Sequence, residues 1–534
     1  MDSSRNIEDA VRAYEKGEIN KAVKILKDLF YKDPNSYEVL MNLANLEHTR
    51  GNLEEAKMYA ERCLKLASSW EMHDIMFDFH YSKGQYREAL KHIEHAVKLC
   101  EGEEKELLRK KKMELESELL RSLKVLHFSI DSPYICRYVE FLTENFGFME
   151  HTFILDVGEN LISHAHENFK FIIACDDPSL GDQPIPINVL TNFLYPSDIF
   201  HSGREIVREI RIPRDLEKRL HLLLNSCDIF IIHGFFGFSN RILIPFFYKN
   251  PDYLNKAVYI PWTGDYFDMY WYLKNLSNTG ISLASKYGAH IVLFYMQRRI
   301  IKRISTIINL QGSLEEVCEV FNHNFKNAYL FSPYPIVTNF KLLDSLIDVK
   351  YKKDSRYILL GNSAHPYNRH VETLKVLRNV IGDGGFVICP LSYPPRSVEA
   401  VDKYVNNVIK QGKQLFGEKF IPLLKMIPRH NYARMLSYMD VGVFNSLRRQ
   451  GFGNIIAMLY LGKKVYMAGT SLRKDLEALG IEVYPIGNVR RADFYEHDEK
   501  TAVANRQKVL EVFSETTLIE NWRRFFVDMA LKKR

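Results

Sequence analysis

The sequence predicts an α-helical repeat array followed by two α/β domains in tandem. Three observations carry this prediction: a glycine-centred unit recurs in the first hundred residues, strands alternate with helices from Leu123 onward, and the alternation restarts near Tyr357. Strands that alternate with helices usually form a parallel sheet covered on both faces. Two such sets in a chain of 534 residues therefore predict two doubly wound domains whose strand ends face a common cleft.

The helical repeats are predicted from a glycine that recurs with a nearly constant period. Gly17, Gly51 and Gly84 are 34 and 33 positions apart, and each is followed by an apolar residue at +2 and an alanine at +5. Glycine suits the turn between two helices, and alanine lets the helices pack closely. The period and the pattern resemble the tetratricopeptide repeat. Such arrays hold a peptide or protein partner on their concave face; the alternative is a structural cap or a dimer surface.

The changes of pattern along the chain predict the domain boundaries. We expect the repeats at 1–100, a charged linking and capping helix at 101–122, the first α/β domain at 123–340 and the second at 341–490. The remaining helices, 491–534, are expected to cross back to the first α/β domain.

Composition and charge narrow the class of protein. The net charge of +6 is compatible with anionic ligands or a membrane surface, and the basic residues are too dispersed for a nucleic-acid partner. The seven cysteines are scattered without a C-x-x-C, which favours reduced thiols. The N-terminus lacks the basic start and apolar core of a signal peptide, and no apolar run reaches about 18 residues. We therefore expect a cytoplasmic protein whose membrane contact, if it has one, is peripheral.

Polar loops follow three predicted strands of the second α/β domain. They are "GNSAHPYNRH" after the strand "ILL", "PLSYPPRS" after "GFVIC", and the stretch from Asn445 to Gly453 at the end of "DVGVFN". Because the carboxyl ends of parallel strands meet at one edge of a sheet, these loops are expected to form one ligand site. The candidate binding residues are Gly361, Asn362, Ser363, Asn368, His370, Tyr393, Asn445, Arg448, Arg449, Gln450, Gly451, Gly453 and Asn454.

The loop "RRQGFGN" has the chemistry of a diphosphate site. Gly451 and Gly453 allow close approach of the backbone, and the helix expected to start near Asn454 offers free N–H groups and a favourable dipole. Arg448 or Arg449 adds a permanently charged donor pair. A nucleotide sugar needs such a site because its diphosphate gains charge as the glycosyl bond breaks. The alternative is a loop that only turns a strand into a buried helix.

The sequence contains no D-x-D triplet, which a metal-dependent transferase of nucleotide sugars usually shows. We therefore expect no metal and no cofactor, with the nucleotide sugar as a substrate. On the acceptor side, Asp265, His233 and Asp131 each follow a predicted strand. Each is a candidate base or acceptor contact. Their alternatives are, in the same order, a helix N-cap, a buried and hydrogen-bonded histidine, and a turn residue.

Several spaced motifs together resemble bacterial glycosyltransferase family 56. They are "GNSAHPYNRHVETLKVL", "CPLSYPPRSVEAVDKYV", "MIPRHNYARMLSYMDVGVFN" and "RRQGFGNIIAMLYLGKKVYM", with "HGFF", "PWTGDYF" and "PYP" earlier in the chain. The family comprises TDP-N-acetylfucosamine:lipid II N-acetylfucosaminyltransferases, also described as 4-alpha-L-fucosyltransferases. The resemblance, over Leu123 to Gly487, implies a GT-B fold with two Rossmann-like domains facing a cleft. It places the nucleotide-sugar donor in the C-terminal half. It places the acceptor, a membrane-bound lipid-linked saccharide, in the N-terminal half.

The sequence departs from these relatives in two ways. Gln450 stands where GT-B enzymes often have glutamate, so ribose recognition is expected to use other groups. The repeats are not part of the family pattern, so the acceptor is either a lipid-linked saccharide or a protein such as flagellin that the repeats recruit. A rival from another class is a non-catalytic repeat scaffold with a degenerate transferase domain.

One segment bears on membrane contact. If Arg298–Leu310, "RRIIKRISTIINL", is helical, it puts five isoleucines on one face and most basic residues off it. Such a helix either docks peripherally on anionic lipid or packs on the core with a solvated basic side.

Overall fold

The computed structural model describes most of the chain. The residues it describes are 2–533 except 131, 157–168, 175–213, 236–242, 268–293, 337, 348, 350–354, 383, 393–398 and 497. Two compact units result, one formed by Met1–Leu123 with Phe526–Arg534 and the other by Lys124–Phe525.

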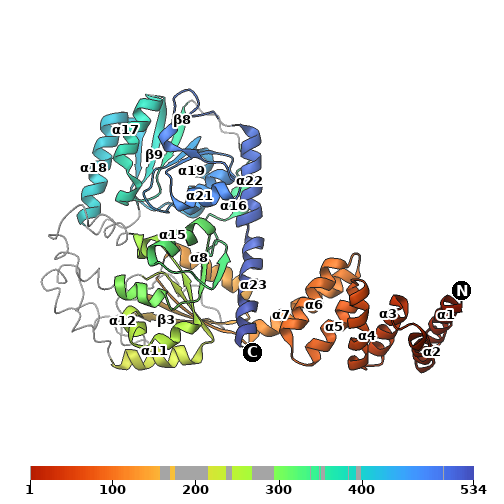
Figure 1. Cartoon of the computed structure of the whole chain (residues 1–534). Coiled ribbons are helices and arrows are strands. Elements are labelled where there is room, and N and C mark those ends of the chain that lie inside the picture. The colour runs from red at the N-terminus through yellow and green to blue at the C-terminus, as the bar shows by residue number, and fades with distance from the viewer. Residues whose placement is uncertain are drawn as a thin grey trace. The chain divides into compact units, whose positions relative to one another are not determined.

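The first unit is the helical array that the repeats predict. Its helices, drawn red to orange in Figure 1, are α1 (Asp2–Glu15), α2 (Ile19–Lys32), α3 (Tyr37–Thr49), α4 (Leu53–Leu66), α5 (Trp70–Ser82), α6 (Tyr86–Leu99) and α7 (Glu104–Arg121). Gly17, Gly51 and Gly84 lie in the turns within the helix pairs at φ of 77°, 78° and 68°. The three alanines at +5 are completely buried, so the repeat pattern is explained by turn geometry and close helix packing.

The second unit contains two parallel sheets. Sheet A consists of β1 (Lys124–Ile130), β2 (Glu150–Asp156), β3 (Phe169–Ala174), β4 (Ile229–His233), β5 (Ala257–Ile260), β6 (Thr306–Asn309) and β7 (Asn327–Leu330). Its strand order is β3-β2-β1-β4-β5-β6-β7. The described helices of this half include α8 (Pro133–Phe146), α11 (Arg214–Ser226), α12 (Ile244–Lys249) and α15 (Gln311–Phe321).

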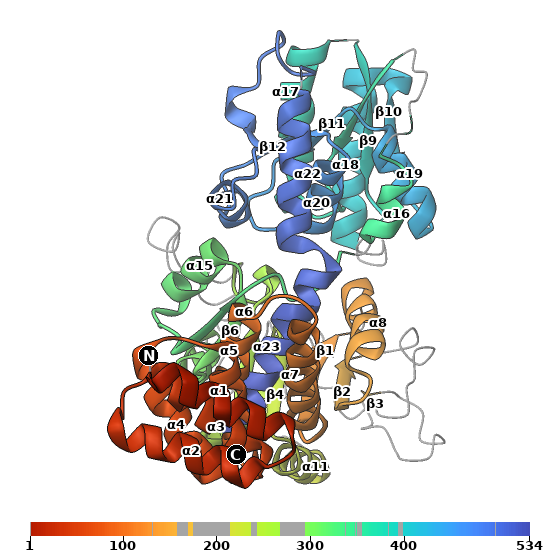
Figure 2. The same ribbon diagram turned by 90° about the vertical axis from the view of Figure 1, so that its right-hand side faces the viewer.

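Sheet B follows the same scheme. Its strands are β8 (Arg356–Leu360), β9 (Gly385–Pro390), β10 (Phe420–Leu423), β11 (Val441–Phe444), β12 (Lys464–Met467) and β13 (Tyr484–Pro485), in the order β10-β9-β8-β11-β12-β13. Its helices are α16 (Phe340–Asp344), α17 (His370–Ile381), α18 (Glu399–Phe416), α19 (Arg429–Tyr438), α20 (Phe452–Tyr460) and α21 (Ser471–Ala478). In Figure 2, α22 (Glu499–Phe513) runs beside α20, and Arg506 Nε donates to Tyr460 O at 2.8 Å.

Each sheet has one point where the strand order reverses. In sheet A it lies between β1 and β4, and in sheet B between β8 and β11. In open α/β sheets, ligands sit outside the carboxyl ends of the strands at such a switch point. The topology therefore indicates that ligands bind at the loops after β1 and β4 in sheet A and at the loops after β8 and β11 in sheet B.

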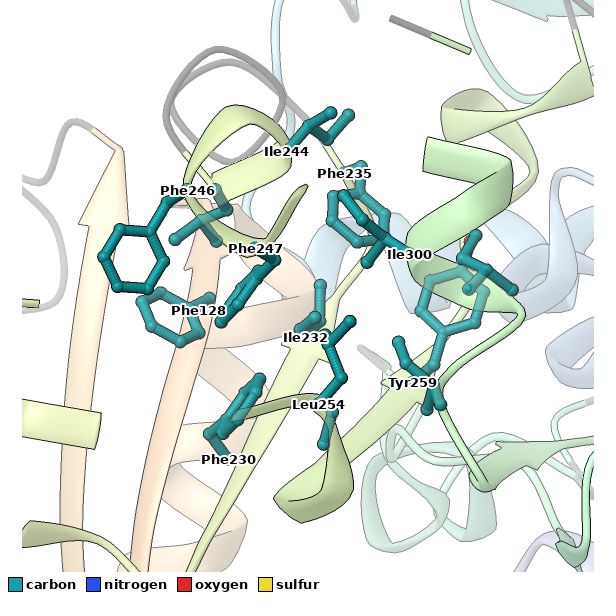
Figure 3. Packing of buried hydrophobic residues seen from close by; sticks show 14 of the residues in the cluster. Phe128, Phe230, Ile232, Phe235, Ile244, Phe246, Phe247, Leu254, Tyr259 and Ile300 are labelled. Atoms are coloured by element: carbon teal, nitrogen blue, oxygen red, sulfur yellow. The ribbon is translucent and has the colours of Figure 1, made fainter. Parts of the chain in front are cut away.

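An aromatic core fixes the strands of sheet A. Phe128 of β1, Phe230 of β4 and Phe247 of α12 are fully buried and pack together, with the rings of Phe230 and Phe247 stacked at 5.2 Å (Figure 3). The strands of both sheets are short and largely apolar because helices cover both faces. This rigid core holds the strand ends, and hence the candidate site residues, in place.

The structure corrects the expectation for Arg298–Leu310. It is not one helix: the helix over residues 294–301 ends, and Thr306–Asn309 form β6. Ile300, Ile301, Ile304, Ile307 and Ile308 are at most 1% exposed. A strand and a turn interrupt the supposed apolar face, so these isoleucines belong to the core and offer no surface for lipid.

The described residues also bear on the expectations for membrane-spanning helices and for cysteines. No helix in the described part of the chain is long and apolar enough to cross a membrane. Six described cysteines are free thiols: Cys63, Cys100, Cys136, Cys227, Cys318 and Cys389. The last helix, α23 (Glu515–Lys533), contacts β7 of sheet A, where the rings of Phe525 and Tyr329 are 5.0 Å apart, and Trp522 Nε1 donates to Pro333 O in the segment after β7 at 3.0 Å.

Candidate functional site

The loops after β8 and β11 meet at the switch point of sheet B. Gly361 follows β8 with φ of 70°, and its N–H donates to Val443 O at 2.9 Å. A Cβ atom added to Gly451 would lie 3.2 Å from Asn362 Oδ1. Within the described residues, Asn362 Oδ1 and Gln450 Nε2 are buried atoms without a hydrogen-bond partner. Two loops distant in the sequence thus bring unsatisfied amide groups to one place.

The start of α20 has the features of an anion site. Gly451 is in the left-handed region with φ of 77°, and the helix begins at Phe452, two residues before the predicted start. No side chain caps it, and no acceptor is found in the described chain for the N–H groups of Phe452, Gly453 and Asn454. A Cβ atom on Gly453 would have no neighbour within 4 Å. An uncapped helix start facing open space can receive an anionic group.

Asn368 and His370 place a second polar pair behind Gly361. Asn368 Nδ2 donates to the carbonyl and hydroxyl oxygens of Ser363 at 2.9 and 3.1 Å, which leaves Oδ1 buried without a partner among the described residues. His370 Nδ1 is 2.7 Å from the Tyr404 hydroxyl, and its Nε2 is likewise unpartnered. Burial lowers the pKa of His370 to about 3, so the ring is neutral.

The two unpartnered atoms, His370 Nε2 and Asn368 Oδ1, both lie next to Gly361. A Cβ atom there would lie 2.7 Å from His370 Nε2 and 3.4 Å from Asn368 Oδ1. Any side chain at position 361 would therefore collide with the imidazole, in addition to the strain at positive φ. The glycine in "GNS" is required by this close approach and by the turn.

Asn445 holds the loop together instead of facing open space. Arg369, which the sequence did not single out, donates from Nε to Asn445 O at 3.0 Å and from Nη2 to Asn445 Oδ1. Asn445 Nδ2 donates to Thr373 Oγ1 at 3.0 Å. Both polar ends of the Asn445 side chain are thus used inside the fold, and Asn445 and Arg369 fix the loops after β11 and β8 relative to each other.

The two arginines of the loop differ in their surroundings. The Arg448 guanidinium lies 5.0 Å from the ring centroid of Tyr367, and its Nε donates to Gln450 Oε1 at 3.4 Å. Arg449 Nη1 donates to Asn309 Oδ1, at the end of β6 in sheet A, at 2.8 Å. Burial lowers the pKa of Arg449, and the nearby carboxylates of Asp475 and Glu316 act in the opposite direction. Arg449 therefore joins the loop after β11 of sheet B to sheet A.

The other predicted residues are placed as follows. Asn454 Nδ2 donates to the Tyr432 hydroxyl at 2.8 Å. Asp265 ends the short 3-10 helix η4 (Thr263–Asp265), and nothing is described of its side chain. Asp131 and Tyr393 lie outside the described residues.

His233 is fully buried at the end of β4, with both ring nitrogens in hydrogen bonds. Its partners are His127 Nδ1 at 3.0 Å and the Tyr334 hydroxyl at 2.7 Å. The ring therefore does not face a substrate directly. The sequence missed His127 and Tyr334, although the alternation in "LKVLHFSI" places His127 on one face of β1.

Two parts of the chain match known families. Residues 281–530 match the family described as 4-alpha-L-fucosyltransferase glycosyl transferase group 56, and residues 10–105 match the TT21 fifth ARM repeats domain. The "HGFF" and "PWTGDYF" motifs precede the matched range of group 56.

Two solved trehalose-phosphate synthases share the fold of the α/β part of the chain. The UDP-forming alpha,alpha-trehalose-phosphate synthase of Burkholderia xenovorans has a TM-score of 0.51 at 12% identity, over 77% of this chain and 99% of that one. The corresponding enzyme of Burkholderia vietnamiensis has a TM-score of 0.50 at 10% identity, over 77% and 100%. A mutant O-GlcNAc transferase of Thermobaculum terrenum aligns over 99% and 98% at 11% identity, with a TM-score of 0.42. The chain is therefore a glycosyltransferase with a GT-B fold preceded by helical repeats, and its residues 281–530 match glycosyl transferase group 56.

Proposed function

We propose that the enzyme transfers a deoxy or deoxyamino hexose from a nucleoside diphosphate donor to a lipid-linked saccharide in cell-surface glycan synthesis. The single observation that carries the donor site is the meeting of Gly361–Asn362 with Gly451 at the switch point of sheet B, beside an uncapped helix start. This site lies inside the range that matches a fucosyltransferase family, which supports a deoxy sugar.

The donor's diphosphate is proposed to lie at the start of α20. The free N–H groups of Phe452, Gly453 and Asn454 and the dipole behind them supply positive potential without a side chain. Arg448 lies in the same loop and adds a permanent charge. Gln450 and Asn362, each with an unsatisfied buried amide atom, are proposed to hydrogen-bond the nucleoside or sugar hydroxyls.

These groups support breaking of the glycosyl bond without a metal. The developing charge on the leaving diphosphate is offset by preorganised amides and an arginine, which need no reorganisation at the moment of reaction. Among the described residues no cluster of three or more His, Cys, Asp or Glu has the arrangement to hold a metal ion. We propose on the chemistry of the loop, and on the missing D-x-D, that catalysis is metal-independent.

The acceptor is proposed to approach the carboxyl ends of sheet A. Asp265 follows β5 and ends η4 at this edge, and we propose that its carboxylate takes the proton of the attacking hydroxyl. Thr263 of the same segment donates to Arg449 O at 3.0 Å, so the segment adjoins the donor loop. We propose a cytoplasmic enzyme that works at the inner face of the membrane, where a lipid-linked acceptor is found.

A second candidate acceptor is a protein, and the repeats favour it. The array carries exposed apolar side chains, among them Tyr31, Leu107 and Met113 at 77%, 60% and 56% exposure. Stacked helix pairs with such side chains commonly hold a peptide or protein. If the acceptor is a protein, the repeats recruit it. If the acceptor is a lipid-linked saccharide, the repeats only place the enzyme within an assembly.

Calorimetry with nucleotides tests the donor site. UDP, GDP, dTDP and their sugar conjugates are titrated into the intact protein, and at least one is expected to bind with a dissociation constant in the micromolar range.

The variant Gly453→Val tests the proposed diphosphate position and should bind the nucleotide more weakly, and Gly480→Val is its control. A Cβ atom meets nothing within 4 Å at either position, but only Gly453 adjoins the proposed diphosphate. Because Gly480 has φ of 75°, thermal melts must show that its variant is folded before it is used. Absence of binding by all nucleotides to the wild-type protein would refute the proposal.

Removal of residues 1–68 separates the two acceptors. The cut spares α5 to α7, which share the unit with the C-terminal segment: Arg87 Nη2 donates to Leu531 O and Lys533 Nζ to Ser122 O. Full transfer by this truncation to a detergent-solubilised lipid-linked saccharide supports the lipid acceptor. Loss of transfer to a captured protein, with nucleotide binding intact, supports the protein acceptor. A thermal melt confirms the fold of the truncated enzyme beforehand.

A further inference from the structure

A chain of hydrogen bonds crosses the interior of sheet A and ends at its carboxyl edge. His151 Nδ1 and His127 Nε2 are 3.0 Å apart, and His127 Nδ1 and His233 Nε2 are also 3.0 Å apart. His233 Nδ1 then lies 2.7 Å from the Tyr334 hydroxyl, which accepts a hydrogen bond of 2.8 Å from Trp262 Nε1. Three buried imidazoles are thus connected to one tyrosine hydroxyl.

The register explains why these residues meet. His127 of β1 is opposite Phe153 of β2 and opposite Ile231 of β4. His151 and His233 are each two positions from those partners, so all three histidines lie on one face of the sheet. They form a diagonal from the beginning of β2 to the end of β4, across the switch point between β1 and β4.

Trp262 fixes the direction of one hydrogen bond. An indole N–H only donates, so the Tyr334 oxygen accepts it. The rest of the chain has two arrangements: the Tyr334 hydroxyl donates to His233, His233 to His127 and His127 to His151, or each of these three contacts is reversed. In either arrangement each contact holds one hydrogen, and all three rings stay neutral. Burial supports this, since it lowers the pKa of His151 and His233 to about 3 and that of His127 well below its usual range.

The tyrosine at the end of the chain adjoins the donor loop. Tyr334 is half-buried, in contrast to the fully buried histidines. It lines a pocket together with Ser332 of the same segment and Phe452, the first residue of α20. Trp262, which donates to the Tyr334 hydroxyl, is followed by Thr263, whose Oγ1 donates to Arg449 O at 3.0 Å, so the hydroxyl is held by a segment that contacts the proposed donor loop.

We propose that Tyr334 contacts the attacking hydroxyl of the acceptor, and that His233, His127 and His151 are positioning residues that fix the Tyr334 hydroxyl. The acceptor class is a hydroxylated one, a saccharide or water, because the Tyr334 oxygen offers a hydrogen bond and no charge. His233 does not touch the substrate, since it is fully buried and both nitrogens are engaged. The inference rests on the proposed transfer from a nucleotide sugar. It adds a contact to the acceptor side, while Asp265 remains the proposed base.

Hydrolysis of the donor, with water as the acceptor, provides the assay. The probe is the tightest binder among UDP-N-acetylglucosamine, UDP-glucose, GDP-fucose and dTDP-glucose, and release of the nucleoside diphosphate is measured. Tyr334→Phe is expected to lower kcat about tenfold to hundredfold, because a hydroxyl that is no longer oriented attacks less often. The dissociation constant of the donor should stay within about twofold.

Tyr138, which also packs against His233, is the matched control for Tyr334. Tyr138 of α8 packs against His233 and Trp522 with ring centroids 5.3 and 5.2 Å away, and its hydroxyl is buried without a partner among the described residues. Tyr138→Phe removes the same atom from the same core and should leave kcat unchanged. A large loss of activity in Tyr138→Phe would show that the assay reports core packing, and would overturn the assignment to Tyr334.

A double variant tests whether the histidines act through Tyr334. His127→Phe keeps the ring that stacks on Phe153 at 4.2 Å but breaks the chain, and should lower kcat about tenfold. In the Tyr334→Phe background the same change should have almost no further effect. Additive losses, or full activity of Tyr334→Phe, would refute the inference. If the wild-type protein binds none of the four nucleotide sugars, the proposed function fails as well; binding with an unaffected Tyr334→Phe refutes only the role of Tyr334.

Discussion

Arg449 Nη1 donates a hydrogen bond of 2.8 Å to Asn309 Oδ1, and this contact joins the strand ends of the two sheets. Arg449 belongs to the loop after β11, and Asn309 is the last residue of β6. Nearby, Asp475 of α21 accepts hydrogen bonds from Gly312 N and Ser313 Oγ at the start of α15, at 2.5 and 2.8 Å. The loop proposed to bind the donor is thus supported from the half that contains sheet A.

Arg449 has two separable roles, which a pair of variants distinguishes. If its charge also serves the diphosphate, Arg449→Ala should weaken nucleotide binding by about 1.5–3 kcal/mol, or ten- to a hundredfold. Asn309→Ala removes the partner but keeps the charge, and should change nucleotide affinity by less than about threefold. Isothermal titration with the preferred nucleotide checks both. Equal affinities of wild type and Arg449→Ala would assign this arginine to the joint between the sheets alone.

The two glycines of the proposed donor loop, Gly451 and Gly453, are expected to respond differently to substitution by alanine. Gly451→Ala strains a residue at φ of 77° and brings its Cβ atom 3.2 Å from Asn362 Oδ1, which should cost about 1–2 kcal/mol of unfolding free energy. Gly453→Ala meets open space within the first turn of α20 and should leave stability unchanged or raise it by about 0.5–1 kcal/mol. Denaturant unfolding measures the difference, and the opposite order of stability would contradict the described helix start.

Buried neutral histidines should make the protein sensitive to acid. Burial lowers the pKa of His151, His233 and His370 to about 3, while each titrates near 6.5 in the unfolded chain. The unfolded state therefore binds more protons below pH 6.5, and the free energy of unfolding falls as the pH drops from about 6.5 towards 3. Each histidine contributes up to about 2 kcal/mol of loss at pH 5.

Urea unfolding at pH 7 and pH 5 measures this sensitivity. His370→Gln should reduce the difference between the two pH values by about 2 kcal/mol. The matched control is His430→Gln, which changes an exposed ring that water hydrates in both states and should leave the difference unaltered. A difference that is the same in wild type and His370→Gln would show that His370 is not buried as a neutral ring.

Turnover of the nucleotide sugar should survive chelation. The proposed diphosphate site uses amides and arginine, so EDTA should change the rate of donor hydrolysis by less than about twofold. The rate is measured with and without added Mg²⁺ or Mn²⁺. Loss of activity in EDTA that either ion restores would contradict the proposed metal-independent site.

The sequence by itself determined the architecture, because each part repeats a local pattern. The period of Gly17, Gly51 and Gly84 reflects a turn that recurs in every helix pair, and the packing alanines follow from it. The alternation of apolar strands with helices was enough to predict two parallel sheets. The loops "GNS" and "RRQGFGN" were recognised because glycine at positive φ and polar residues after a strand are local signals.

The tertiary structure decided which of these loops meet and which side chains remain unsatisfied. Strand order is non-local, so only the sheet shows that β8 and β11 are neighbours and that Asn362 touches Gly451. The isoleucines of Arg298–Leu310 have the spacing of a helix, yet packing against sheet A divides them between a helix, a turn and β6. The chain from His151 to Tyr334 combines residues from β2, β1, β4 and the segment after β7, more than 180 positions apart along the sequence. No local pattern encodes such a meeting, because it depends on the register of three strands that the core fixes together.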